Sequence, residues 1–309
     1  MCSARRRSFA CNASASGEAM KKRRLVQWLS TLAHNAYLPG FWRGQIYTGT
    51  TKRVCLPGFN CYSCPGAVGA CPIGALQAVL GSVKTQVSLY VTGLLLLFGM
   101  VAGRWICGWL CPFGLFQELL YKIRSPKWKL PARLRPLKAT KVVLLVVLVI
   151  LLPMFAVNFA GQGDPWYCKY VCPNGTIFGA LPLMATNPSL RAAAGWLFSW
   201  KMLVAVVTVA LCVVLYRWFC KFLCPLGAIY GLLNRLSVYR MHLNEHACVH
   251  CGACARVCRM DVDPTKSPNS AECIRCGDCV KACPHRALRM GISVEVEDSR
   301  ERPHPAERL

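Results

Sequence analysis

The chain has 309 residues, a formal net charge of +24, and 54% apolar against 16% charged residues. Such a basic balance first suggests nucleic acid. The basic residues gather at the ends of apolar segments, however, so membrane topology explains them better and no nucleic-acid partner is expected. Twenty-one cysteines in a long apolar chain exclude a small secreted disulfide scaffold and favour metal ligation.

The first quarter of the chain contains a polar tail, an apolar segment and a loop with cysteines. Residues 1–20 are polar, and the basic run 21–24 precedes an apolar stretch at 25–42 that polar residues interrupt. Two interpretations of this stretch stay open, a short membrane helix and an amphipathic helix in the membrane interface. The loop that follows carries Cys55, Cys61, Cys64 and Cys71.

Three further apolar segments, at residues 87–106, 142–160 and 201–216, predict membrane-spanning helices. The loop between the first two is the most basic of the chain, which places it on the cytoplasmic side. Residues 161–200 contain only two basic residues and are expected on the outer side. The sequence beyond Arg235 is expected to be soluble and cytoplasmic.

A Cys-Pro-x-Gly tetrapeptide occurs four times in this part of the chain. Proline suits the first position of a helix, so the cysteine before it holds its sulfur at the positive helix end, where thiolate is favoured. Three of the copies have another cysteine four residues earlier. The tetrapeptides begin at Cys71, Cys111, Cys172 and Cys224, and the earlier cysteines are Cys107, Cys168 and Cys220.

The segments 104–114 and 217–227 share Arg, Trp, both Cys, Leu, Pro and Gly in register, which indicates an internal duplication. Two units of the same orientation predict parallel repeats related by an axis along the membrane normal. The inner cysteines Cys107, Cys111, Cys220 and Cys224 would then form one four-thiolate site near the cytoplasmic face. On the outer face Cys168 and Cys172 would lie opposite Cys64 and Cys71, with Cys61 as a further candidate ligand.

Other interpretations of these residues stay open. Membrane cysteines can be small buried apolar residues, and on the outer face Cys55 with Cys61, or Cys168 with Cys172, could form disulfides. Arg104 and Arg217 stand at equivalent helix ends. They either offset the negative charge of an inner cluster, as cofactor-binding residues, or anchor to lipid headgroups.

The C-terminal part contains two runs of cysteines with the spacing C-x2-C-x2-C-x3-C. This is the pattern of a bacterial two-cluster ferredoxin, in which the fourth cysteine of each run ligates the other cluster. Structural zinc is the alternative, but it favours two C-x2-C knuckles set well apart. One [4Fe–4S] cluster is expected on Cys248, Cys251, Cys254 and Cys283, and the other on Cys258, Cys273, Cys276 and Cys279.

With these motifs the chain resembles a family of membrane-bound ferredoxin-type proteins over about residues 87–290. The family includes the membrane component of the periplasmic nitrate reductase quinol dehydrogenase, the methylamine-utilisation ferredoxin-type protein and cytochrome-oxidase accessory polyferredoxins. The resemblance implies four-helix membrane anchoring, cytoplasmic [4Fe–4S] clusters and electron transfer with quinone or redox proteins. The outer cysteines depart from the family pattern and suggest an additional outer redox centre.

The sequence therefore predicts a mainly α membrane protein with about four transmembrane helices in two parallel repeats, plus a small α+β dicluster ferredoxin domain. The expected divisions are a polar tail at 1–20, a membrane domain at 21–240, a ferredoxin domain at 241–292 and a charged tail at 293–309. The leading hypothesis is electron transfer between cytoplasmic clusters and a membrane or extracytoplasmic redox partner, with flavin- or haem-bearing proteins and quinone as candidates.

Two alternatives to this hypothesis are considered. One is the membrane component of a quinol dehydrogenase, an electron-transfer component of an oxidoreductase system, with His34, Glu118 and Asp164 as candidate proton acceptors. The other is a metal-handling or maturation factor that uses the outer cysteines for copper or thiol exchange. The expected location is the cytoplasmic membrane, crossed several times, with the ferredoxin domain on the cytoplasmic side.

Overall fold

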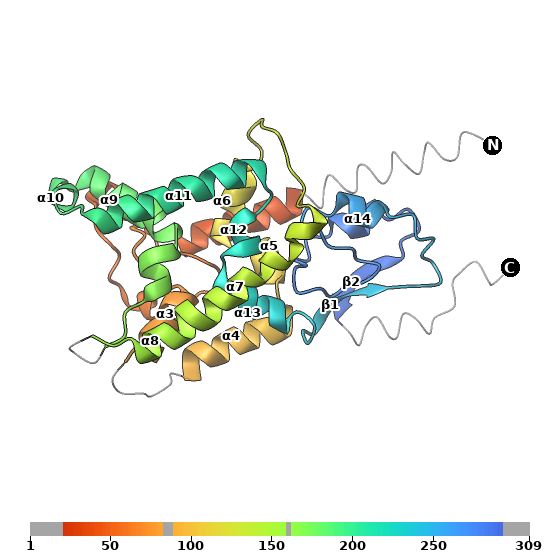
Figure 1. The fold of residues 1–309 in the computed structure, drawn as a ribbon, viewed down its shortest axis with the longest axis horizontal. Coiled ribbons are helices and arrows are strands. Elements are labelled where there is room, and N and C mark those ends of the chain that lie inside the picture. The colour runs from red at the N-terminus through yellow and green to blue at the C-terminus, as the bar shows by residue number, and fades with distance from the viewer. Residues whose placement is uncertain (1–20, 83–88, 159–161, 293–309) are drawn as a thin grey trace.

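The computed structural model describes residues 21–82, 89–158 and 162–292 (Figure 1). The predicted tails at 1–20 and 293–309, with Cys2 and Cys11, lie outside the described residues. So do the edges of two predicted spans, at residues 87–88 and 159–160. The described chain is mostly helical, with an elongated helical part and a small α+β unit at one end (Figure 1).

The helical part occupies the chain from residue 21 to Leu233. Its elements are a helix at residues 21–34, α2 (Pro39–Arg43), η1 (Thr50–Arg53), α3 (Pro72–Leu80), α4 (Leu89–Ala102), α5 (Trp105–Trp109), α6 (Pro112–Leu120), η2 (Ala132–Ala139), α7 (Thr140–Leu144), η3 (Leu145–Leu151), α8 (Leu152–Phe155), η4 (Tyr167–Val171), η5 (Gly175–Ala180), α9 (Leu181–Thr186), α10 (Pro188–Ala192), α11 (Trp196–Val214), α12 (Trp218–Phe222) and α13 (Pro225–Leu233).

Two helices in the described residues are long and apolar enough to cross a membrane, by length and composition. One is the continuous helix Pro136–Phe155, formed by the end of η2 with α7, η3 and α8, and the other is α11. They coincide with the predicted spans at 142–160 and 201–216, and each begins a few residues earlier than predicted. The predicted span at 87–106 is represented by α4, which has only 14 residues and ends where Gly103 adopts a positive φ.

Helices α3, α6 and α13 each begin at the proline of a Cys-Pro-x-Gly motif, as the sequence predicts. In each case the preceding cysteine has extended backbone dihedrals, so its side chain stands at the start of the helix. The fourth motif leads into the π-helical turn η5, which continues into α9. The motif thus sets both the start of a helix and the place of a sulfur.

The α+β unit is built on one antiparallel pair of strands, β1 (Tyr239–Leu243) and β2 (Leu288–Ile292). Two short helices, α14 (Ala253–Val257) and α15 (Asp278–Ala282), each follow a glycine in the left-handed region, Gly252 and Gly277. Strands and helices enclose a small core with Met241, Leu288, Cys254 and Cys279. Sheet and cysteine runs therefore fold as one unit.

Candidate metal centres

The eight cysteines of the α+β unit line two cavities, each with three cysteines of one run and the fourth of the other. The distal group is Cys248, Cys251, Cys254 and Cys283. The proximal group is Cys258, Cys273, Cys276 and Cys279. Cys251 is exposed, whereas Tyr216 of the helical part lines the cavity of the proximal group. The proximal group therefore faces the helices and the distal group faces away from them.

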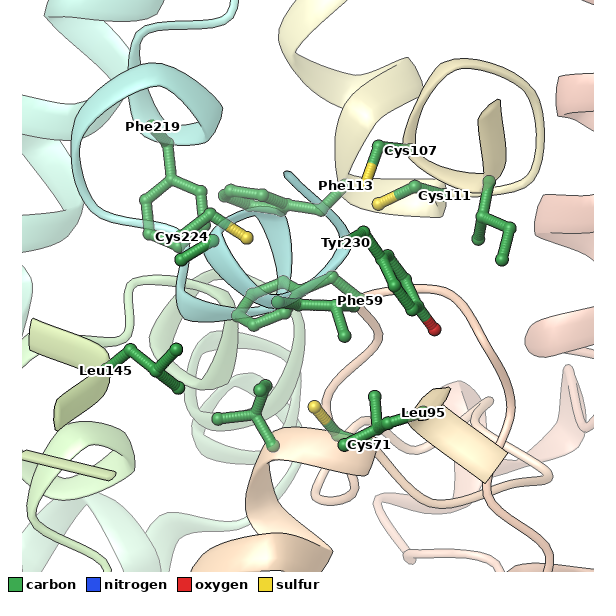
Figure 2. Close-up of a cluster of buried hydrophobic side chains, with 14 of the residues drawn as sticks. Phe59, Cys71, Leu95, Cys107, Cys111, Phe113, Leu145, Phe219, Cys224 and Tyr230 are labelled. Atoms are coloured by element: carbon green, nitrogen blue, oxygen red, sulfur yellow. The ribbon is translucent and has the colours of Figure 1, made fainter. Parts of the chain in front are cut away.

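The four cysteines predicted at the inner face are brought together in the helical part. This inner group consists of Cys107, Cys111, Cys220 and Cys224, all 4–6% exposed. Burial, followed by the neighbouring Cys220 and Cys107, raises the pKa of the Cys111 thiol to about 12, and Cys224 interacts with the same three thiols. The sulfurs of Cys107 and Cys111 point toward the same space, and that of Cys224 faces them (Figure 2).

Arg104 and Arg217 make reciprocal contacts across this group. Arg104 donates to the carbonyl of Cys220 at 3.2 Å, and Arg217 donates to the carbonyl of Cys107. A Cβ added to Gly114 would lie 3.1 Å from the guanidinium of Arg217. A Cβ added to Gly227 would lie 3.3 Å from the guanidinium of Arg104. Both side chains are fully buried, which excludes the interpretation that they anchor to lipid headgroups.

Six buried basic side chains around the inner and proximal groups share three carboxylates. Glu118, Glu272 and Asp261 are each in contact with two of these cations. The cations are Arg23 and Arg217 on Glu118, Arg104 and Lys141 on Glu272, and Lys138 and Lys221 on Asp261. These ion pairs carry an excess of positive charge, which favours an anionic group beside them.

The α+β unit is seated directly on the inner group. Gly108, next to Cys107, is so close to Ile274 of the proximal run that a Cβ would lie 2.3 Å from its carbonyl oxygen. Trp109 donates to the carbonyl of Arg275 at 3.1 Å. From the other half, Lys221 donates to the carbonyl of Arg259 at 2.9 Å. The peptide that joins two proximal cysteines thus touches the residue beside an inner cysteine.

Outer cysteines from two distant segments also lie together. The outer group consists of Cys61, Cys71, Cys168 and Cys172, whose thiols interact electrostatically with one another. Burial chiefly raises the pKa of Cys168, to about 11. The sequence placed Cys64 opposite Cys168 and Cys172. In the structure its neighbours are Cys61 and Lys52, and its thiol donates to Asn35 at 3.5 Å.

Sequence reasoning missed two glutamines at these groups. The side-chain amide of Gln117 donates to the sulfur of Cys220 at 3.1 Å, and that of Gln77 donates to the sulfur of Cys168 at 3.2 Å. Each glutamine also donates to the carbonyl four residues earlier in its own helix. Their common position in the sequence could have revealed them, because each stands six residues after the cysteine of a Cys-Pro motif.

Each of these groups offers four cysteines, which is the ligand set that a [4Fe–4S] cluster takes. All nineteen described cysteines are free thiols, including the pairs considered for disulfides. Grouped thiols beside excess positive charge are the surroundings that suit thiolate-bound clusters.

Comparison with known proteins agrees with this class. Residues 85–131, 142–183 and 196–244 match one family described as a 4Fe-4S binding domain, and residues 267–289 match a second with the same description. The chain therefore belongs to the ferredoxin-type iron–sulfur family. Together the domains and the relatives described next support an iron–sulfur protein of the ferredoxin type.

Three relatives illustrate the similarity. An uncharacterized protein of Methanocaldococcus jannaschii is 25% identical over 62% of this chain and 66% of its own length. The methylamine utilization ferredoxin-type protein MauN of Methylorubrum extorquens is 29% identical over 60% of this chain and 59% of its own. YccM of Escherichia coli, named as an electron transport protein, is 27% identical over 83% and 71%.

The chain thus spans less than two thirds of the length of the first two of these relatives. No solved structure matches the chain.

Proposed function

We propose that this protein is a membrane-anchored conduit for single electrons, between cytoplasmic [4Fe–4S] clusters and a redox partner in the membrane or beyond it. The distal and proximal groups would hold the two ferredoxin clusters, the inner group a third and the outer cysteines a further centre. The clusters supply one-electron chemistry. The chain supplies thiolates, apolar cover and fixed spacing between the groups.

The observation that carries this proposal is the contact between the proximal and inner groups. Ile274, between two proximal cysteines, is part of the same buried core as Cys107, Cys111 and Cys224. Asn234, at the end of α13, donates to the carbonyl of Cys273 at 3.1 Å. Packed side chains and hydrogen bonds, rather than solvent, therefore connect the two groups, which an electron path requires. Exposed Cys251 makes the distal group the point of entry or exit.

Membrane anchoring is supported by the exposed apolar faces of the two long helices. In the most apolar 18-residue stretch of each helix, only 28% of Pro136–Phe155 and 17% of α11 is buried inside the protein. The core helix of a soluble protein, in contrast, is mostly buried. Leu203, Val206 and Val207 on α11 are among the exposed apolar residues. We place the ferredoxin unit, residues 241–292, on the cytoplasmic side with the basic loop, because Lys138 of that loop donates to the carbonyl of Met260 at 3.0 Å.

A parallel arrangement of two repeats is part of the proposal. Each half contributes an arginine that crosses to the carbonyl of the other half's first cysteine, and this exchange of equivalent contacts is what a pseudo-two-fold axis produces. The two halves are not identical, because only the first has a glutamine six residues after the Cys-Pro cysteine. Four transmembrane helices would require α4 and the helix at residues 21–34 to complete the bundle.

The cluster content of the full chain tests the conduit. The protein is purified anaerobically in detergent, and its iron is quantified by Mössbauer spectroscopy. Three or more [4Fe–4S] clusters per chain, with the loss of one in Cys107→Ser and in Cys220→Ser, support the proposal. Only two clusters, unchanged in both variants, would leave a tethered ferredoxin and remove the conduit.

A quinol dehydrogenase component is the second candidate function, and one observation favours it. A cavity of about 230 Å³ lies beside Cys64 and is lined by aromatic and amide side chains, among them Trp28, Phe116, Asn35 and Asn60. Apolar walls with a few polar groups suit a quinone ring. Reduction of the clusters by a short-chain quinol, lost when Phe116→Trp fills the cavity, would support this function, whereas unchanged reduction would remove it.

The three proton acceptors considered for quinol oxidation differ in their surroundings. Although burial acts to raise it, Arg217 and Arg23 hold the pKa of Glu118 below its ordinary value, and that carboxylate is also hydrogen-bonded by Tyr216. Asp164 is a half-buried partner of Lys169. His34 is buried, with Nδ1 on the carbonyl of Ser30 at 2.7 Å. Glu118 is thus an ion-pair partner rather than a free base.

A further inference from the structure

We infer that the outer group is a second four-thiolate [4Fe–4S] site, with Cys61, Cys71, Cys168 and Cys172 as its ligands and Gln77 as a hydrogen-bond donor to it. This deepens the proposed function, on which it rests, by assigning the outer redox centre its ligands. It also excludes Cys55 and Cys64, which sequence spacing alone could not separate from the ligands.

The first argument is the place of the thiols. Cys71 lies within electrostatic range of Cys168 and Cys61, and Cys172 lies within electrostatic range of all three. Cys61 and Cys71 come from the loop before α3, whereas Cys168 lies in the turn η4 and Cys172 directly follows it, more than ninety residues later. Long-range folding therefore assembles four sulfurs that neither segment could gather alone, and a cubane cluster takes four cysteine ligands.

The second argument is the space beside two motif glycines. A Cβ on Gly175 would lie 3.5 Å from the sulfur of Cys61, and one on Gly74 would lie 4.0 Å from the sulfur of Cys168. Each glycine belongs to one segment and faces a sulfur of the other. Its missing side chain leaves room where sulfurs of the two segments converge. At the inner group the corresponding glycines face Arg217 and Arg104 instead.

The third argument is that the outer group repeats the hydrogen bonding of the inner group. Gln77 and Gln117 hold the same position after their Cys-Pro motifs, and each donates to the first cysteine of the opposing C-x3-C pair. The backbone N–H of Tyr167 donates to the amide oxygen of Gln77 at 3.0 Å, which directs the amide nitrogen toward Cys168. An amide donor aimed at a sulfur stabilises the added negative charge of a thiolate.

A lysine supplies the cation that arginines supply at the inner group. Lys201, near the start of α11, interacts electrostatically with both Cys61 and Cys168. Its ammonium nitrogen lies 3.7 Å from the Cβ position of Gly175. Anionic clusters are stabilised by adjacent positive charge. The outer group thus has the same three components as the inner one, namely four thiols, an amide donor and a cation.

Two buried tyrosines connect the outer and inner groups. Tyr167 lies within electrostatic range of Cys71, Cys168, Cys172 and inner Cys224, and its hydroxyl donates to the carbonyl of Leu223 at 3.1 Å. Tyr230 likewise lies near outer Cys71 and inner Cys107, Cys111 and Cys224, and in Figure 2 its ring stands between Cys111 and Cys71. Well-packed aromatic side chains therefore fill the space that an electron would cross.

The excluded cysteines have other surroundings. The thiol of Cys64 donates to Asn35, and Lys52 is its nearest cation. Cys55 is buried, and burial alone shifts its pKa upward. Both therefore serve as controls, because they belong to the same loop as Cys61 and are buried as Cys71 and Cys172 are.

The experiment is iron quantification and Mössbauer spectroscopy of the full chain, purified anaerobically in detergent. Four [4Fe–4S] clusters, about 16 iron atoms, are expected per chain. Cys61→Ser and Cys168→Ser should each lose about four iron atoms, whereas Cys64→Ser and Cys55→Ser should keep all of them. Gln77→Leu should retain its iron but lower the potential of one cluster, a readout that survives if the serine variants fold poorly.

The outcomes separate this inference from the proposed function. Three clusters in the wild type, with Cys61→Ser unchanged, would overturn the outer site and leave the conduit to the inner group. Two clusters would overturn both. Loss of iron in Cys64→Ser equal to that in Cys61→Ser would overturn the ligand assignment, and copper binding by the outer cysteines in iron-free protein would replace the cluster by a metal-handling site.

Discussion

The seat of the ferredoxin unit on the inner group can be tested at one glycine. In Gly108→Ala the new methyl group would lie 2.3 Å from the carbonyl oxygen of Ile274, which belongs to backbone and cannot rotate away. Restoring an ordinary contact requires the segment to retreat by roughly 1 Å, and overpacking of this kind costs about 1–3 kcal/mol. Alanine also favours the helical state of α5 by up to about 1 kcal/mol, which masks part of this cost.

Gly93→Ala is the matched control, because Gly93 lies in α4 and nothing lies within 4 Å of its Cβ position. It contributes the gain in helix propensity without the clash. Hydrogen–deuterium exchange of the amides at residues 271–276 should be roughly 5- to 150-fold faster in Gly108→Ala than in Gly93→Ala, as 1–3 kcal/mol corresponds to that ratio. Equal exchange in the two variants would show that this segment is not seated on α5, and the electron path through it would lose its basis.

Three further predictions concern the inner group. Gln117→Leu removes a donor to the sulfur of Cys220 and should lower one cluster potential by about 20–60 mV, from 0.5–1.5 kcal/mol per hydrogen bond; an equal shift of the same cluster in Gln77→Leu would contradict it. Glu118→Gln leaves two buried arginines without their carboxylate and should cost about 3–5 kcal/mol at pH 7. The pKa of Glu118 is lower in the folded than in the unfolded protein. The difference in unfolding free energy between the wild type and Glu118→Gln is therefore fully present above the unfolded carboxyl pKa of about 4.3, and it should shrink as the pH falls below that value. Denaturation midpoints that differ equally at pH 7 and pH 3.5 would refute the ion pair. Arg104→Gln should lower the potential of the inner cluster more than Gln117→Leu, since a full charge is lost, and redox titration showing no shift would remove its charge-offsetting role.

Features encoded in short-range spacing could be predicted from the sequence. The helices that begin at Pro72, Pro112 and Pro225 follow from the fixed φ of proline. The long apolar helices follow from composition, although their ends were displaced by several residues because apolar runs do not mark the first helical turn. The 14 residues of α4 show the limit of this reasoning, since hydropathy continued through Gly103, where the helix ends.

The duplication predicted that the inner cysteines of the two halves meet, but the partners of single side chains in distant segments could not be predicted. The sequence explains the basic loop between the first two predicted spans by membrane topology alone. Its residues Lys138 and Lys141 are in fact buried, and they bind the carbonyl of Met260 and the carboxylate of Glu272. Cys61 and Cys64 could not be distinguished, because a loop has no periodicity from which side-chain direction follows. The position of Gln117 could have been noticed from the repeat, but its target is more than a hundred residues away.

The charges and sulfurs of the inner and proximal groups belong to one arrangement. Six buried cations on three carboxylates would be costly in a low-dielectric interior if nothing else balanced them. Protonated thiols do not supply that balance, and burial raises the pKa of the Cys111 thiol to about 12, so that thiol is neutral near pH 7. A [4Fe–4S] cluster bound by the inner group, as we propose, would displace thiol protons and leave a net charge of about −2 on the four-thiolate group. The same basic residues that hold the ferredoxin unit in place would favour that anion, which would link cluster loading to the docking of the two parts.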